Sequence, residues 1–182
     1  TTDDIQALIT EQVHAMSSAQ LSALTTDQVN AMTVDQLQVL QLGTPLVLDL
    51  NGDGVQTRSL AAGVRFDLFG TGQPVQTGWV DGQDGLLVQD RNGDGRINDG
   101  SELFGSATRL PDGATAADGY AALRASDSNG DGAITAADAS WSQLGVWVDA
   151  NGDGVNQAAE VRSLDALGIT RLDASATSTS EK

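Results

Sequence analysis

Hydrophobic positions in the first forty residues follow an eight-residue repeat. Leucine or methionine recurs once per repeat, at Leu8, Met16, Leu24, Met32 and Leu40. On one continuous α-helix this period rotates the apolar stripe by about 80° per repeat, so no single face stays buried. The pattern therefore predicts a helical octad-repeat segment over residues 1–43, built from short helical turns rather than one long helix.

Capping signals support separate helical turns in this segment. Ser17, Thr25 and Thr33 each stand three residues before a glutamine, which is the spacing of a capping box. A helical spacer or small solenoid is the favoured interpretation, and a specific recognition surface is the alternative. His14 occupies a variable octad position and is expected to be exposed.

Beyond Gly43 the apolar residues gather in short runs between stretches rich in Gly, Asp and Asn. The runs at 46–48, 86–88 and 146–148 predict β-strands. Residues around Tyr120 predict a short helix, and a second helix is expected over 136–144. The aromatic residues are expected to form the core: Phe66, Phe69, Trp79, Phe104, Trp141 and Trp147.

These elements predict an α+β fold organised around its loops. Three parts are expected: the octad segment (1–43), a loop-rich module (44–172) and a polar tail (173–182). Because three of the four loops described next follow strand-like runs, a calmodulin-type helical lobe is excluded.

The loops share one tetrapeptide, Asn-Gly-Asp-Gly, which begins at Asn51, Asn92, Asn129 and Asn151, each time with an aspartate two residues upstream. This is the first half of the EF-hand calcium loop, D-x-[DN]-x-[DN]-G. Side chains at positions 1, 3 and 5 converge on the cation, while a carbonyl at position 7 and an acid at position 12 complete the shell. Oxygen-only donors favour calcium over zinc or copper. Turn formation alone is the alternative, but four copies with the same upstream aspartate argue against it.

The spacing assigns candidate calcium ligands in each loop. The first loop (49–60) supplies Asp49, Asn51, Asp53, the carbonyl of Val55, and Thr57. The second loop (90–102) supplies Asp90, Asn92, Asp94, the carbonyl of Arg96, Asn98 and Glu102. The third loop (127–138) supplies Asp127, Asn129, Asp131, the carbonyl of Ala133, Thr135 and Asp138. The fourth loop (149–160) supplies Asp149, Asn151, Asp153, the carbonyl of Val155, Gln157 and Glu160.

Two loops leave the last ligand open. In the first loop Leu60 stands at position 12, so the final oxygen must come from elsewhere, with Asp67 as one candidate. In the second loop position 12 is serine, so Asp99 or Glu102 would close a loop lengthened by one residue.

Four further aspartates lie beside glycines: Asp81, Asp84, Asp112 and Asp118. They are interpreted as turn formers. Auxiliary ligation is the alternative, and Asp84 is the best placed of the four for it.

Composition narrows the function classes. The chain has 25 acidic and 9 basic residues and a net charge of −16, which disfavours nucleic acid and anionic membrane surfaces as partners. It has no cysteine and one histidine, which excludes thiolate chemistry and sites that need several imidazoles. No stretch is long and apolar enough for a transmembrane segment. The chain begins at Thr1 rather than methionine, so an excised part of a longer polypeptide is expected.

From Pro45 onward the sequence resembles the calcium-dependent self-processing module of FrpC-type iron-regulated RTX proteins. The matching stretches are PLVLDLNGDGVQT, TGWVDGQDGLLVQDRNGDGRINDGSELFG, the region around SDSNGDGAITAADA, and LGVWVDANGDG. The resemblance implies a secreted, multidomain bacterial protein that is exported by a type I system and folded by extracellular calcium. It also implies cleavage of an Asp-Pro bond at the N-terminal edge of the module.

One departure from the family concerns that bond. Here Pro45 follows Thr44, and a threonine hydroxyl cannot form the cyclic anhydride through which an aspartate carboxylate cleaves its own peptide bond. We therefore expect no self-cleavage and no enzyme activity.

The expected function is a monomeric calcium-binding folding module, with up to about four Ca²⁺ ions, in an extracellular or cell-surface protein. Its partners are neighbouring domains of the same polypeptide. An altered self-processing module and an adhesion module with a calcium-ordered face are the alternatives.

Overall fold

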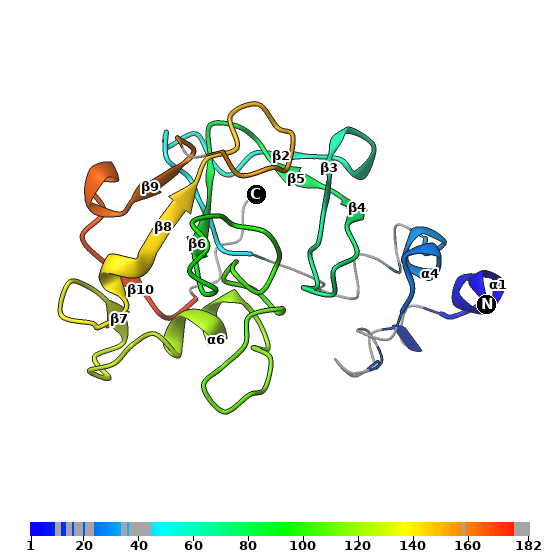
Figure 1. The fold of residues 1–182 in the computed structure, drawn as a ribbon, viewed down its shortest axis with the longest axis horizontal. Coiled ribbons are helices and arrows are strands. Elements are labelled where there is room, and N and C mark those ends of the chain that lie inside the picture. Colours follow the sequence, from blue (N-terminus) through cyan, green and yellow to red (C-terminus); the bar gives the residue numbers. More distant parts are fainter. Residues whose placement is uncertain are drawn as a thin grey trace.

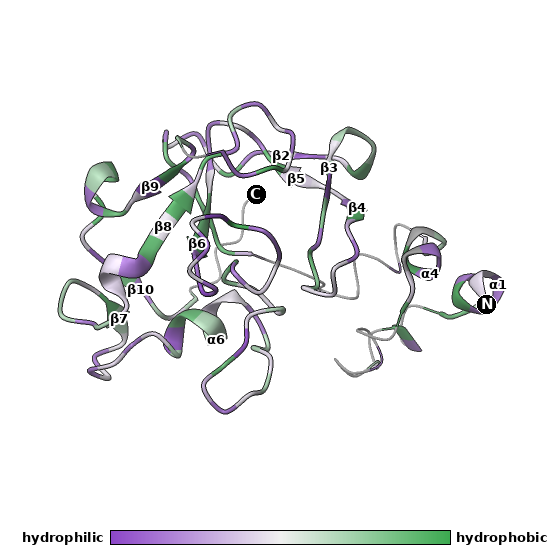
Figure 2. Cartoon of the chain, viewed as in Figure 1, coloured by the Kyte–Doolittle hydropathy of each residue, from purple (hydrophilic) through white to green (hydrophobic). Residues whose placement is uncertain are grey.

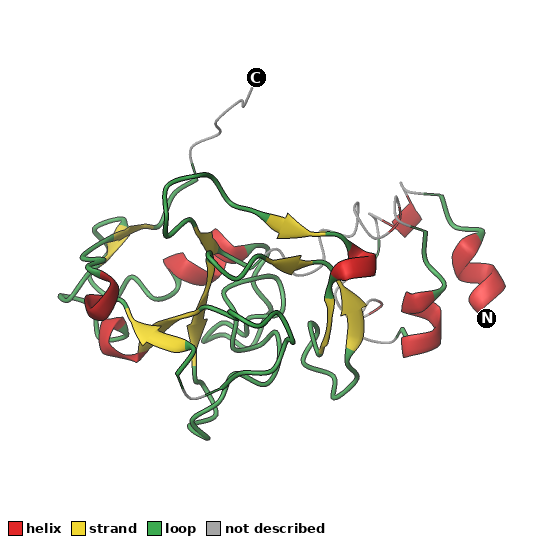
Figure 3. Ribbon diagram, turned by 90° about the horizontal axis from the view of Figure 1, so that it is seen from above, coloured by secondary structure: helices red, strands yellow, loops and turns green. Residues whose placement is uncertain are grey.

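The computed structural model describes residues 1–9, 12–13, 16, 20, 24–33, 36, 45–157 and 159–176. The helices are α1 (Thr2–Gln6), α4 (Thr26–Asn30) and α6 (Gly119–Arg124), and the 3₁₀ turns are η1 (Leu60–Ala62), η2 (Trp141–Gln143) and η3 (Asp165–Leu167). The strands are β1 (Val47–Leu48), β2 (Thr57–Arg58), β3 (Val64–Phe66), β4 (Val75–Thr77), β5 (Trp79–Val80), β6 (Gly85–Gln89), β7 (Ala133–Ile134), β8 (Leu144–Trp147), β9 (Val161–Ser163) and β10 (Leu172–Asp173). The fold is mixed, with short strands and few helices, as the α+β prediction requires (Figures 1 and 3).

Capping boxes organise the octad segment. The Thr25 hydroxyl accepts the backbone N–H of Gln28, and the Gln28 side chain accepts the N–H of Thr25. Thr33 and Gln36 form the same reciprocal pair. The prediction of separately capped helical turns is confirmed at these two repeats, whereas Ser17 and His14 lie outside the described residues.

The octad segment contacts the module through α4. Val29 is buried and belongs to the same hydrophobic cluster as the β3 and β4 residues Val64 and Val75, and α4 lies beside β4 in Figure 1. None of the helices in the described ranges is long and apolar enough to cross a membrane.

An antiparallel sheet in the order β1-β6-β8-β9 forms the centre of the module. One row of the sheet pairs Val47 with Leu86, Leu86 with Trp147, and Trp147 with Val161. Since β1 and β8 are both antiparallel to β6, the first and fourth loops leave from the same end of the sheet. The predicted strands at 46–48, 86–88 and 146–148 are thus confirmed as β1, β6 and β8, within a residue or two at their ends.

The described residues form three hydrophobic clusters. Two involve the central sheet, with Leu86 and Trp147 in the first and Leu87 and Val146 in the second, and the third lies in the octad segment. Phe66, Trp79 and Trp147 meet with ring centroids 5.2–5.8 Å apart, and Phe104 and Trp141 belong to the second cluster. Strands β6 and β8 carry hydrophobic colours in Figure 2. The predicted aromatic core is confirmed, with Phe69 only partly buried.

The predicted helix over 136–144 is wrong. This segment forms turns followed by η2, and Leu144 already belongs to β8. Local side-chain bonds replace helical ones: the Asp138 carboxylate accepts the N–H of Thr135, and the Ser128 hydroxyl accepts the N–H of Ala139. Such bonds compete with the helix, and β-pairing of Leu144 fixes the end of the segment.

The ordered module extends slightly beyond the predicted boundary at residue 172. Asp173 pairs with Ala133 between β10 and β7, and Ala174 is buried, with its N–H bonded to the Gly132 carbonyl. The first two residues of the expected polar tail therefore belong to the fold. Residues 177–182 lie outside the described part.

Candidate functional site: four aspartate loops

The aspartate at position 1 organises each loop in the same way. In the first loop the N–H of Gly52 donates to Asp49 Oδ1 at 2.7 Å, and the N–H of Gly54 donates to Asp49 Oδ2 at 2.9 Å. The same two bonds, 2.7–2.8 Å long, are made by Asp90, Asp127 and Asp149. All four loops therefore close around a carboxylate.

Glycine makes this closure possible. Gly52 and Gly54 have φ of 80° and 89°, and the corresponding glycines of the other three loops are also in the left-handed region. Residues with a Cβ rarely adopt this conformation. The Asn-Gly-Asp-Gly pattern is thus the one that lets two N–H groups reach a single aspartate.

Positions 3 and 5 are linked to one another. In each loop the asparagine Oδ1 accepts the N–H of the aspartate at position 5, over 2.8–3.0 Å. The asparagine Nδ2 donates to that aspartate's Oδ2 in the first, third and fourth loops. In the second loop Asn98 donates to Asp94 Oδ2 instead, at 2.6 Å. The structure brings together the predicted side chains at positions 3 and 5.

In the second and third loops the acid at the C-terminal end of the loop accepts backbone N–H groups from the rest of the loop. Asp138 accepts the N–H groups of Ser128, Asn129 and Thr135, at loop positions 2, 3 and 9. Glu102 accepts the N–H groups of the same three positions in the second loop, from Arg91, Asn92 and Asn98.

Glu102 therefore takes the closing role despite the extra residue in its loop. The other candidate, Asp99, bonds to the N–H and hydroxyl of Ser101. In the fourth loop Glu160 accepts the N–H of Gln157 at position 9.

Hydrogen bonding and burial shift the pKa values of the loop acids in opposite directions. The N–H groups of Gly54 and Gly52 lower the pKa of Asp49, and the N–H of Thr135 lowers the pKa of Asp138. Burial raises the pKa of Glu102, an effect that the N–H groups of Asn98, Asn92 and Arg91 partly offset. Asp49 and Asp138 are thus held in the anionic form that a cation requires.

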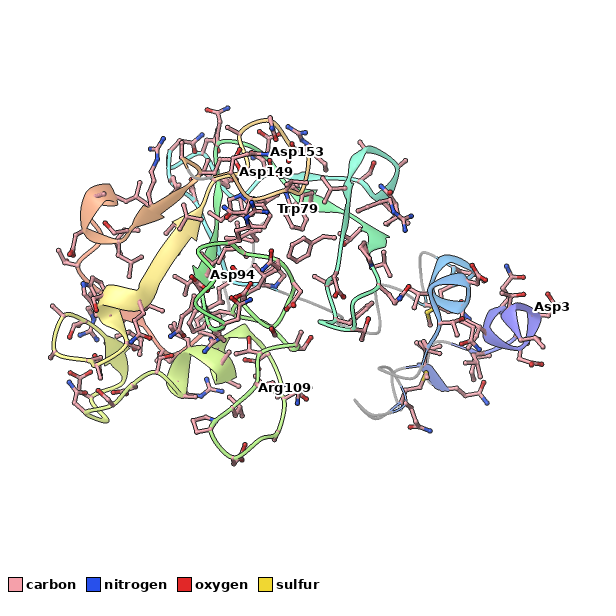
Figure 4. All side chains as sticks on the ribbon, in the orientation of Figure 1. Asp3, Trp79, Asp94, Arg109, Asp149 and Asp153 are labelled. Carbon is pink, nitrogen blue, oxygen red and sulfur yellow. The ribbon has the colours of Figure 1, made fainter. Side chains whose placement is uncertain are left out.

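The fourth loop is joined to the aromatic core. The indole N–H of Trp79 donates to Asp149 Oδ2 at 2.7 Å (Figure 4), and Asp149 is fully buried. The indole N–H of Trp147 donates to Glu160 Oε2 at 3.2 Å. The sequence pattern predicts both tryptophans as core residues but not these contacts, because Trp79 and Asp149 lie 70 residues apart and Trp147 and Glu160 lie 13 residues apart.

The open end of the first loop is contacted by Asp84. Its Oδ2 accepts the N–H of Gln56, at loop position 8, over 2.7 Å. The candidate named from sequence, Asp67, lies in a turn of its own, where its carboxylate accepts the N–H groups of Thr71 and Gly72. The glycines of this turn, at residues 70 and 72, have the spacing of those in the four loops, a signal present in the sequence.

The donor set fits calcium in kind. Every predicted ligand offers oxygen, from carboxylates, side-chain amides, hydroxyls or carbonyls, which is the chemistry of calcium sites. Among the residues that the structure describes, no three Asp, Glu or His side chains are gathered as a metal cluster.

Comparisons with known proteins divide the chain into two parts. The family model described as the SPM domain matches residues 46–182, and the model described as the ALTTAQ repeat matches residues 1–34. The iron-regulated protein FrpA of Neisseria meningitidis serogroup C is 53% identical over 131 residues, which cover 71% of this chain. The chain spans 12% of that relative's length.

Proposed function

Because the chain belongs to the SPM domain family, the self-processing module of FrpC-type RTX proteins, we propose that it is a calcium-dependent folding module. Its EF-hand-like loops take up Ca²⁺, and the bound ions hold together a protein whose folded state is otherwise opposed by its own charge. The module acts within a longer secreted or surface-attached protein, and neighbouring domains of that polypeptide are its partners.

The observation that carries this proposal is the common construction of the four loops. Each places a carboxylate at position 1, an amide at position 3 and a carboxylate at position 5, with the same glycine-supported bonds. Three loops also have an acid bonded to the position-9 N–H. Four independent turns would not need the same acid-rich set of side chains.

Charge supports a folding role. With a net charge of −16, the calcium-free chain repels itself, which destabilises a compact state. Four bound ions would cut the formal charge to about −8. Extracellular calcium sites typically bind with dissociation constants of about 10⁻⁴–10⁻³ M, so such loops fill outside a cell and stay empty inside it.

Isothermal titration calorimetry of the purified chain tests the proposal. We expect saturable calcium binding at several sites and little heat from magnesium, which does not fit a flexible loop as well. Asp127→Ala should weaken binding, because Asp127 is the position-1 ligand of the third loop. Asp112→Ala is the matched control, since the Asp112 carboxylate accepts the N–H of Ala114 in a turn outside the loops. Absence of calcium binding by the unmodified chain would refute the proposal.

We further propose that the module does not cleave itself. Thr44 lies outside the described residues, but its identity precludes the anhydride route at the bond before Pro45. The expected result of prolonged incubation in millimolar calcium is a single intact band by gel electrophoresis and one intact mass. Thr44→Asp is the informative companion variant, since it restores the Asp-Pro pair of the family. Calcium-dependent fragments from the unmodified chain would contradict this expectation.

A further inference from the structure

Asp84 is a buried carboxylate that the loop motif does not include. Its side chain is 1% exposed. Oδ2 accepts the Gln56 N–H, whereas Oδ1 is buried with no hydrogen-bond partner. Among the described residues Asp84 forms no salt bridge. Buried charges in proteins are ordinarily paired or bound to a metal ion, so the free oxygen of Asp84 lacks its partner.

The sheet places Asp84 next to the first loop. Leu48, the last residue of β1, pairs with Gly85, the first residue of β6. Asp49 and Asp84 are the next residues on the two antiparallel strands, so the first loop begins where the turn before β6 ends. The bond from Gln56 then joins Asp84 to the second half of the loop.

The first loop is also the one whose own sequence has no closing acid at or near position 12. After position 8 its chain continues into β2, where Thr57 and Arg58 pair with Val80 and Trp79 of β5. Because of this pairing, the residue at position 12, Leu60, lies in η1 and has no side-chain oxygen to offer. The partner of β2 is β5, and the turn that follows β5 carries Asp84.

Asp84 contacts its loop much as the other closing acids contact theirs. Glu102, Asp138 and Glu160 each accept the N–H at position 9, and Asp84 accepts the N–H at position 8. The turn that carries Asp84 also packs on the fourth loop, since a Cβ added to Gly82 would lie 2.9 Å from the Ala150 carbonyl oxygen.

We infer that Asp84 is the closing calcium ligand of the first loop, supplied by a distant strand in place of position 12. The inference rests on the proposed function. A bound calcium ion would give the unpartnered oxygen of Asp84 a positive neighbour. Asp84 would also add a third carboxylate to those that Asp49 and Asp53 supply to the site.

Calcium titration of Asp84→Asn in the full chain tests this inference. We expect one calcium ion fewer by native mass spectrometry, or one site weakened more than about 10-fold by calorimetry, since even outer partners of metal ligands contribute about 10–100-fold. Asp67→Asn is the matched control: it changes the same charge at a buried aspartate whose two oxygens are both hydrogen-bonded. It should retain every site.

Stability measurements separate ligation from a structural role. In EGTA, Asp84→Asn should unfold at the same temperature as the unmodified chain or a higher one, because the amide still accepts the Gln56 N–H and removes an unpaired charge. In calcium the same variant should unfold at a lower temperature than the unmodified chain in calcium. An equal loss in both conditions, unchanged calcium stoichiometry and affinity, or loss of the site in Asp67→Asn would overturn the inference. Absence of calcium binding by the unmodified chain would instead refute the proposed function itself.

Discussion

In 10 mM calcium the chain should unfold at a temperature at least about 20 °C above its midpoint in EGTA. A site with a dissociation constant of about 10⁻⁴ M is then held at 100 times that constant and contributes about 2.7 kcal/mol to the free energy of unfolding, so four such sites contribute about 11 kcal/mol. A typical domain has about 5–15 kcal/mol in total. Calcium is therefore expected to contribute a large share of the module's stability.

Circular dichroism during heating provides the measurement. Sodium chloride at matched ionic strength is the first control, because screening of the acidic surface alone stabilises a chain of this charge. Magnesium at the same concentration is the second. A shift that sodium chloride reproduces in full, or identical unfolding curves in calcium and EGTA, would contradict a calcium-driven fold.

Asp149→Asn should lower the free energy of unfolding by about 2–4 kcal/mol even without calcium. The Asp149 carboxylate is fully buried and accepts the N–H groups of Gly152, Asp153 and Gly154 and the indole N–H of Trp79. Asparagine keeps the shape but offers a single acceptor oxygen. The donors that faced the replaced oxygen then face an amide NH₂ at a fully buried position. Each unsatisfied donor costs about 1–3 kcal/mol.

Asp49→Asn provides the matched comparison. Asp49 has the same loop position and the same two glycine bonds, but it is exposed to solvent and has no indole partner. Its replacement should cost about 1 kcal/mol or less, since water can satisfy the released donors. Urea unfolding in EGTA measures both variants, and equal losses would show that burial against Trp79 is unimportant.

A double-mutant cycle with Trp79→Phe isolates the indole contact. Because Trp79 Nε1 donates to Asp149 Oδ2, the double variant should be destabilised by less than the sum of the two single changes. Additive effects would mean that the indole bond contributes nothing to the loop's stability.

Short-range patterns predicted much of the fold. The runs at 46–48, 86–88 and 146–148 became β1, β6 and β8 because apolar runs of this length are suited to a buried sheet. The helix around Tyr120 was likewise confirmed as α6. The helix expected over 136–144 failed, since side-chain bonds from Asp138 and the pairing of Leu144 outweighed helical propensity.

Local sequence is enough to specify the first six positions of every loop. Those contacts join residues at most five apart, as in the bonds from Gly52 and Gly54 to Asp49, so spacing and glycine conformation suffice to specify them. What completes the loops depends on the tertiary fold, which brings Asp84 to the first loop and Trp79 to Asp149 of the fourth. These residues arrive through strand pairing between segments distant in the chain, and no local pattern encodes which strands meet.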